Sequence, residues 1–85
     1  MKYTLIWDHP TISEFMVRVP GRVLGSDMVI LGNIEISHEL ISGGFSAQCR
    51  NIRGKVVYDG MPTFDIEECV FELLDYVENE YEDNG

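Results

Sequence analysis

Hydrophobic and polar residues alternate in short stretches along the first three quarters of the chain. Residues 2–7, 14–19 and 45–50 each show a period of two, with aromatic or β-branched residues on one side. This alternation is typical of strands that bury one face. Residues 55–58 are a further expected strand. The Pro20-Gly21 pair is expected to end the strand at 14–19.

The segment from residue 28 to residue 37 allows two interpretations. A continuous apolar run, Met28–Leu31, precedes Gly32-Asn33 and a second run, Ile34–Ser37. The segment is either a hairpin that turns at Gly32-Asn33 or one long strand with a bulge at Gly32. The long strand is preferred, because residues 25–27 already supply a hairpin turn before it. Residues 42–44, 51–54 and 59–62 are expected loops or turns.

The period of the pattern changes after residue 64. Apolar residues now recur at helical spacing and form one face of an amphipathic helix. That face consists of Ile66, Cys69, Val70, Leu73, Leu74 and Val77. Asp65 lies three residues before Glu68, which matches a capping box, and Phe64 is placed to act as a hydrophobic staple. The helix is expected from about residue 65 to about residue 81, before a fraying acidic tail at 82–85.

These elements predict an α+β fold, in which an antiparallel sheet of four to five strands carries one C-terminal amphipathic helix packed on one face. With 85 residues the chain forms a single domain, 1–85, whose core is small. The apolar run near the start is too short for a signal peptide, and no stretch approaches a membrane span. A cytoplasmic location is therefore expected. Cys49 and Cys69 are expected to be reduced, buried thiols, because their spacing matches neither a metal motif nor a disulfide framework.

The chain shows no recognisable catalytic or metal-binding pattern. His9 and His38 are its two histidines. Ser37 and Glu39 flank His38, but neighbours on an extended strand point to opposite faces and cannot form a relay. The sequence lacks zinc and calcium motifs, and its glycines match no phosphate-binding loop. We therefore expect no enzymatic activity, no cofactor and no metal.

The distribution of charge is more informative than its sum. The net charge is −9, yet residues 1–64 hold six acidic and six basic residues, which cancel. Residues 65–85 hold nine acids and no base. The one basic cluster, Arg50, Arg53 and Lys55, is small enough to pair with these acids, so direct binding of nucleic acid is not expected.

The acidic segment departs from an ordinary solvated helix face. Without lysine or arginine the usual i,i+4 ion pairs are missing, and acids near the helix end oppose the helix dipole. We therefore interpret the segment as a partner-binding surface rather than only a solubilising one. Its candidate residues are Glu67, Glu68, Glu72, Asp75, Glu78, Glu80, Glu82 and Asp83. Its density, roughly one charge per 3 Å of helix, approaches that of a nucleic-acid strand, about one per 3.4 Å.

In overall character the chain resembles the small acidic inhibitors that bacteriophages make against host defence enzymes, including anti-CRISPR proteins and nucleic-acid mimics. The shared features are a short single domain, the missing catalytic pattern and the acidic run Asp65–Asp83. The resemblance implies a location in the host cytoplasm. It also implies a basic partner surface on a nucleic-acid-binding protein, such as a nuclease or a CRISPR surveillance complex. It assigns no individual site residue.

Two other interpretations remain open. HicB-type antitoxins also combine a Met-Lys-Tyr start, an early strand and an acidic amphipathic helix, but this chain lacks their strand order and its helix comes last. A structural module that self-associates through its sheet is the second. The acidic helix and an apolar strand are the competing binding surfaces.

Overall fold

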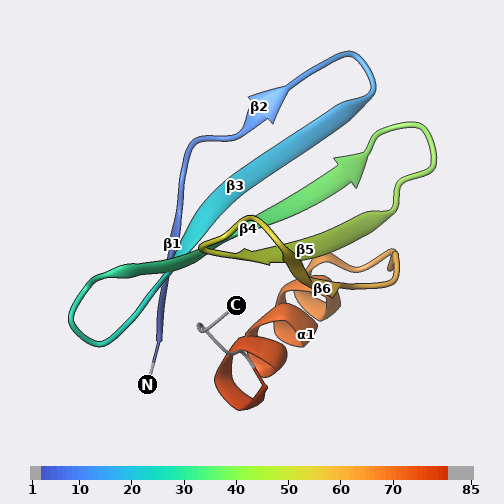
Figure 1. Ribbon diagram of the computed structural model, residues 1–85. Helices are drawn as coiled ribbons and strands as arrows, with labels where there is room; N and C mark the ends of the chain where they lie inside the picture. The colour runs from blue at the N-terminus through green and yellow to red at the C-terminus, as the bar shows by residue number, and fades with distance from the viewer. Residues whose placement is uncertain (1–2, 81–85) are drawn as a thin grey trace.

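The computed structural model describes residues 3–80 and has the predicted α+β architecture, an antiparallel sheet with one C-terminal helix (Figure 1). The elements are β1 (Thr4–Trp7), β2 (Thr11–Ile12), β3 (Met16–Leu24), β4 (Ile30–Glu39), β5 (Phe45–Asn51), β6 (Val56–Asp59) and α1 (Ile66–Asn79). The strand order is β1-β3-β4-β5-β6, and β2 also pairs with β3. The short β2 was not predicted, since two residues carry no periodicity.

The two longest strands, β3 and β4, form the central hairpin of the sheet. Its turn begins at Gly25, whose backbone N–H donates to the carbonyl of Val29 at 2.8 Å. The preferred interpretation, one long strand through Gly32-Asn33, is therefore confirmed, and this strand starts at Ile30. The pairing slips by one residue opposite Val23 and Leu24, which leaves Leu31 as the extra residue. The bulge thus lies one position before the expected Gly32.

The prediction that Pro20-Gly21 ends a strand is wrong, because β3 runs through both residues. The Pro20 carbonyl accepts a hydrogen bond from the backbone N–H of Asp8 at 2.8 Å. In a strand the N–H and C=O of one residue point to the same side. The nitrogen of Pro20, which carries no hydrogen, therefore faces the segment between β1 and β2, where no strand needs a donor. A Cβ on Gly21 would lie 2.6 Å from the carbonyl oxygen of Ile6, so glycine allows β1 to approach.

The helix begins as the sequence indicates and is slightly shorter than expected. The Asp65 side chain caps it by accepting the backbone N–H of Glu67 at 2.9 Å. Phe64 does not form the predicted staple, because its side chain is 84% exposed. The entry of the chain into the helix is held instead by backbone pairing between Phe45 and Thr63. The predicted fraying tail lies outside the described residues.

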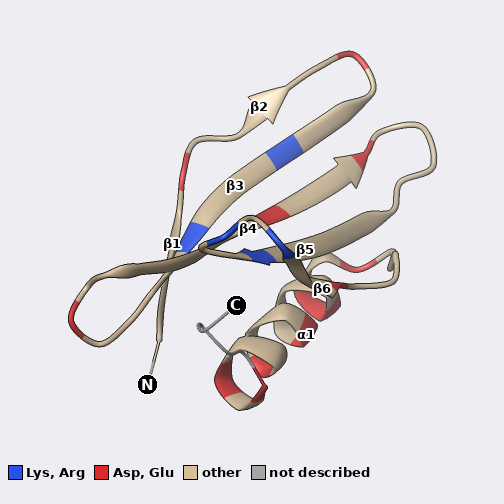
Figure 2. Ribbon diagram, in the orientation of Figure 1, with Lys and Arg blue, Asp and Glu red and all other residues tan. Residues whose placement is uncertain are grey.

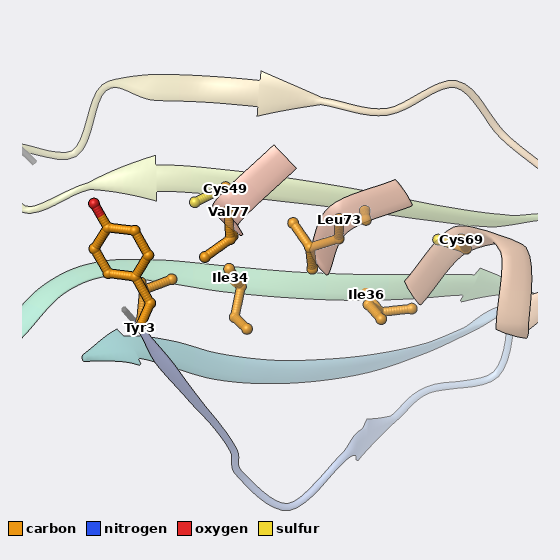
Figure 3. Close-up of a cluster of buried hydrophobic side chains, with 9 residues drawn as sticks. Tyr3, Ile34, Ile36, Cys49, Cys69, Leu73 and Val77 are labelled. Atoms are coloured by element: carbon orange, nitrogen blue, oxygen red, sulfur yellow. The ribbon is translucent and has the colours of Figure 1, made fainter. Parts of the chain in front are cut away.

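The hydrophobic core lies between α1 and the middle of the sheet (Figure 3). Cys69, Leu73 and Val77, spaced by four residues, are the buried positions of the helix. They face residues of β4 and β5 that also carry the period-two pattern. The core consists of Tyr3, Val23, Ile34, Ile36, Ala47, Cys49, Cys69, Leu73 and Val77.

Candidate partner-binding surface

Three of the predicted acids lie together on the exposed surface of α1, outside its buried stripe. Glu68, Glu72 and Asp75 are exposed and are separated by four and three residues, so they share one helix face. The buried Leu73 marks the opposite side of the same helix. In Figure 2 the acidic positions follow the helix along its length. The structure therefore brings these three predicted residues together on one exposed surface, which we call the acidic face.

The other predicted acids have different positions. Glu67 is exposed and Glu78 is partly buried, and their spacing of eleven residues places both on one flank of the helix. Glu80 is the C-cap residue, and its backbone N–H donates to the carbonyl of Tyr76 at 2.8 Å. Glu82 and Asp83 lie outside the described residues.

Among residues 3–80 no basic side chain forms an ion pair with a helix acid. The two ion pairs in this range join Arg22 to Asp8 at 2.9 Å and Arg18 to Glu35 at 4.0 Å. Arg22 alternates with the buried Val23, so these pairs lie on the sheet face opposite the helix. In Figure 2 the helix carries acidic positions but no basic ones, whereas the sheet carries both.

The basic cluster near the β5–β6 turn does not neutralise the helix, which corrects the expectation from the sequence. Arg50 instead donates to the backbone carbonyl of Gly54 at 2.9 Å. It is drawn into this local turn because the chain reverses between β5 and β6 within reach of its side chain. Neither Arg53 nor Lys55 makes a side-chain ion pair within the described part of the chain.

The negative charge of the acidic face affects the pKa of two neighbouring groups, Cys69 and Tyr58. Burial raises the pKa of the Cys69 thiol, and the Glu72 carboxylate raises it further. The pKa of Tyr58 is raised by the same two causes in the same order, with a smaller contribution from Cys69. A nearby negative charge disfavours deprotonation of both groups, as expected for an acid without a basic partner.

The side chains that could support catalysis do not converge. His38 stacks on Phe45 with ring centroids 4.1 Å apart, and His9 is exposed in a loop. Within the described range no three histidine, cysteine or acidic side chains could hold a metal ion together. Cys49 and Cys69 are buried and not disulfide-bonded.

A hollow of about 370 Å³ on the sheet face opposite the helix contains charged groups but no serine, threonine, cysteine or histidine. Its lining includes Arg22, Arg50, Asp8 and Glu35, so positive and negative side chains both occur in it. The Nε atom of Arg22 is buried there without a hydrogen-bond partner. The mixture of charges gives this hollow no preference for an anion or a cation.

A second feature of α1 was not predicted from the sequence. Phe71 is 68% exposed and Ile66 is 46% exposed, although both belong to a helix that packs on a sheet. Together with Val70 and Leu74 they line a hollow of about 380 Å³ beside the acidic face. The sequence did contain one indication of this apolar surface. Phe71 is a large aromatic residue that falls outside the apolar face defined by the periodicity.

No helix within residues 3–80 combines the length and the apolar character needed to cross a membrane. Comparison of the chain with protein-family models, curated proteins and solved structures finds no match.

Proposed function

We propose that this protein acts without catalysis, by placing the acidic face of α1 on a basic surface of another protein. The observation that carries the proposal is that none of the described helix acids has a basic partner within the described chain. A protein that needed these acids only for its own fold would offset them with lysine or arginine at i,i+4 spacing. An unoffset row of carboxylates is instead complementary to a surface rich in basic side chains.

The partner is proposed to be a nucleic-acid-binding protein. Such proteins present lysine and arginine along the path of a phosphate backbone, and a linear row of carboxylates imitates that pattern of charge. The proposed role is that of a stoichiometric inhibitor, in the manner of the small acidic phage proteins that this chain resembles. A nuclease or a CRISPR surveillance complex is a target of the right chemistry.

The first experiment is to identify the partner and then measure its association kinetics. Tagged protein is used to retain partners from the native host, and each retained protein is purified. Electrostatic steering predicts an association rate that falls as the ionic strength rises from about 0.01 M to about 0.1 M, where the Debye length shortens from about 30 Å to about 10 Å. A rate that did not depend on salt would contradict the proposal.

Matched charge variants distinguish the effect of the acidic face on binding from the effect of the total net charge. The test variant carries Glu68→Gln, Glu72→Gln and Asp75→Asn, and it should associate more slowly and bind more weakly. The control variant carries Glu14→Gln, Glu39→Gln and Asp59→Asn, which are exposed acids outside the helix and outside both ion pairs. Both variants lose the same formal charge. Equal binding by the two would show that only the total charge matters.

A further inference from the structure

The sheet is wider than its single helix can cover. Five strands in the order β1-β3-β4-β5-β6 span about 19 Å between the outer strands, at about 4.8 Å per strand. A helix with its side chains is about 10 Å wide, so one helix covers roughly two strands. Figure 1 shows α1 beside β5 and β6, with β1 and β2 at the other side of the sheet. Of the strands, β5 is the one against which α1 packs most extensively.

The two flanks of α1 therefore have different surroundings. On one flank Tyr76 stacks on Tyr58 of β6, with ring centroids 4.8 Å apart. The opposite flank carries Val70 and Leu74 and faces β1. Side chains on the helix side of the sheet are more exposed toward β1: Val23 of β3 is fully buried, whereas Trp7 of β1 is 37% exposed. The part of the sheet near β1 is thus apolar but only partly covered.

Two adjoining hollows occupy this open side. One, of about 480 Å³, lies between β1 and the helix and is lined by Tyr3, Thr4, Leu5, Trp7 and Leu74. The other is the 380 Å³ hollow along the helix flank that Phe71 borders. Leu74 lines both, so they adjoin at its side chain, and we call the two hollows together the apolar groove. Its sides come from β1 and from the flank of α1.

Acids border the apolar groove on its helix side. Glu67 lines the hollow directly, and Glu78 follows Leu74 by four residues on the same flank. The two positions are eleven residues apart, or about 16 Å along the helix axis. The described residues that line the groove include no lysine, arginine or histidine. An occupant therefore needs apolar residues toward the groove and basic residues toward Glu67 and Glu78.

We propose that the apolar groove binds a basic amphipathic helix of the partner protein, which lies beside α1 on the β1 side of the sheet. This rests on the proposed function and specifies the partner segment that the acidic helix recognises. A second helix packed beside α1 would lie at the usual interaxial distance of about 8–10 Å. Two basic residues about three turns apart would meet Glu67 and Glu78, and the apolar residues between them would contact Phe71, Leu74 and Trp7.

The chemistry of the groove selects this occupant over a second copy of the chain. The helix of a second copy would bring its own Glu67 and Glu78 flank against the same acids, and like charges in contact oppose association. A basic helix instead gains both the apolar contact and the charge complementarity. This is the helix-in-groove mode of recognition, read through anchors at helical spacing.

Trp7 provides a direct reporter, because it is the single tryptophan of the chain and it lines the groove. The probe is a synthetic amphipathic peptide of lysine and leucine, about 18 residues or roughly 27 Å as a helix. Two comparison peptides keep the length but replace lysine with glutamate, or leucine with serine. The lysine–leucine peptide should bind and shift the emission of Trp7 to the blue as water is displaced. The glutamate–leucine peptide should do neither.

Matched phenylalanine variants test the site itself. Phe71→Ser should weaken binding of the lysine–leucine peptide about tenfold, as expected for loss of an aromatic anchor. Phe64→Ser is the control, since Phe64 is 84% exposed and lines neither hollow, and its affinity should equal that of wild type. Circular dichroism checks that both variants remain folded, which their exposed positions favour. Equal affinity of the two variants would overturn the proposed groove.

The remaining outcomes separate the groove from the proposed function. If the lysine–serine peptide bound as well as the lysine–leucine peptide and Trp7 emission did not change, the groove would be overturned and the acidic face would stand. If no lysine peptide bound at low salt, both would be overturned. Equal binding of the glutamate–leucine peptide would overturn the requirement for a basic helix. A stable homodimer whose Trp7 was already shielded would identify a second copy as the occupant.

Discussion

At the scale of single residues, Asn51 is the polar side chain most completely buried among those described. Its Oδ1 atom accepts the backbone N–H groups of Arg53 at 2.9 Å and Lys55 at 3.1 Å. The side chain thus satisfies two donors in the turn between β5 and β6, a role that asparagine commonly has in turns. The sequence indicated a turn at this place but not that its first residue is buried.

Replacing Asn51 with alanine should lower the free energy of unfolding by about 1–3 kcal/mol, because both backbone donors lose their acceptor. Asn33→Ala is the control, since Asn33 is exposed on the neighbouring strand and its side chain forms no hydrogen bond within residues 3–80. Its effect should stay within about 0.5 kcal/mol. Urea unfolding followed by circular dichroism measures both. Similar losses in the two variants would contradict the role of Asn51.

The buried thiols predict a specific dependence on alkaline pH. Burial raises the pKa of Cys49 from its ordinary value of 9.0 to about 11. The folded state therefore retains a proton that the unfolded state loses, and stability should be fully present below pH 9 and fall as the pH rises toward 11. Chemical denaturation across this range measures the slope. Cys49→Ala should reduce the slope, although it also costs stability at neutral pH by creating a cavity.

At the scale of elements, the helix was the clearest feature of the sequence, because six apolar positions repeat at helical spacing and an acid caps the first turn. The alternating strands were also recognisable. The prediction that Pro20-Gly21 ends a strand failed for a reason that lies in the tertiary structure. Strand β3 can continue through Pro20 because the neighbouring chain stops pairing with it after Trp7 and resumes at Thr11. Local sequence contains no information about such an interruption in a neighbouring strand.

The candidate surface was predictable in part. The acids could be placed on the helix from their spacing, and their exposure followed from the apolar face opposite them. The apolar groove could not be predicted, because periodicity identifies which side of a helix is apolar but not how many strands that helix covers. Phe71 illustrates the difference: its position one residue after Val70 placed it off the core face, yet it borders the groove.

The inner face of α1 should dominate the stability of the domain. Leu73 is fully buried, so Leu73→Ala should cost about 2–5 kcal/mol, a large share of the stability of a small domain. Phe71→Ala removes a larger side chain from the same helix but from an exposed position, and should cost no more than about 0.5 kcal/mol. Thermal unfolding measures the difference. A larger loss at Phe71 would show that the helix packs by a different face.

At the scale of the whole molecule, like charges are concentrated on one side. Repulsion within the acidic face opposes folding, so the free energy of unfolding should rise when salt is added at low ionic strength. Glu68→Gln combined with Glu72→Gln should raise stability by a few tenths of a kcal/mol and weaken this salt dependence. Glu14→Gln combined with Glu39→Gln should leave the dependence as in wild type. Urea titrations at two salt concentrations make the comparison.

The break between β1 and β2 has a consequence for self-association of the protein through its sheet edges. Unpaired strand edges are templates for polymerisation, and a long flat edge recruits further chains. Here that edge consists of strands of four and two residues, separated by a segment that contains Pro10, which has no N–H to offer an incoming strand. The opposite edge, β6, is only four residues long. Both described edges of the sheet are therefore poor templates for an incoming strand, and this disfavours filament growth independently of the charge of the helix.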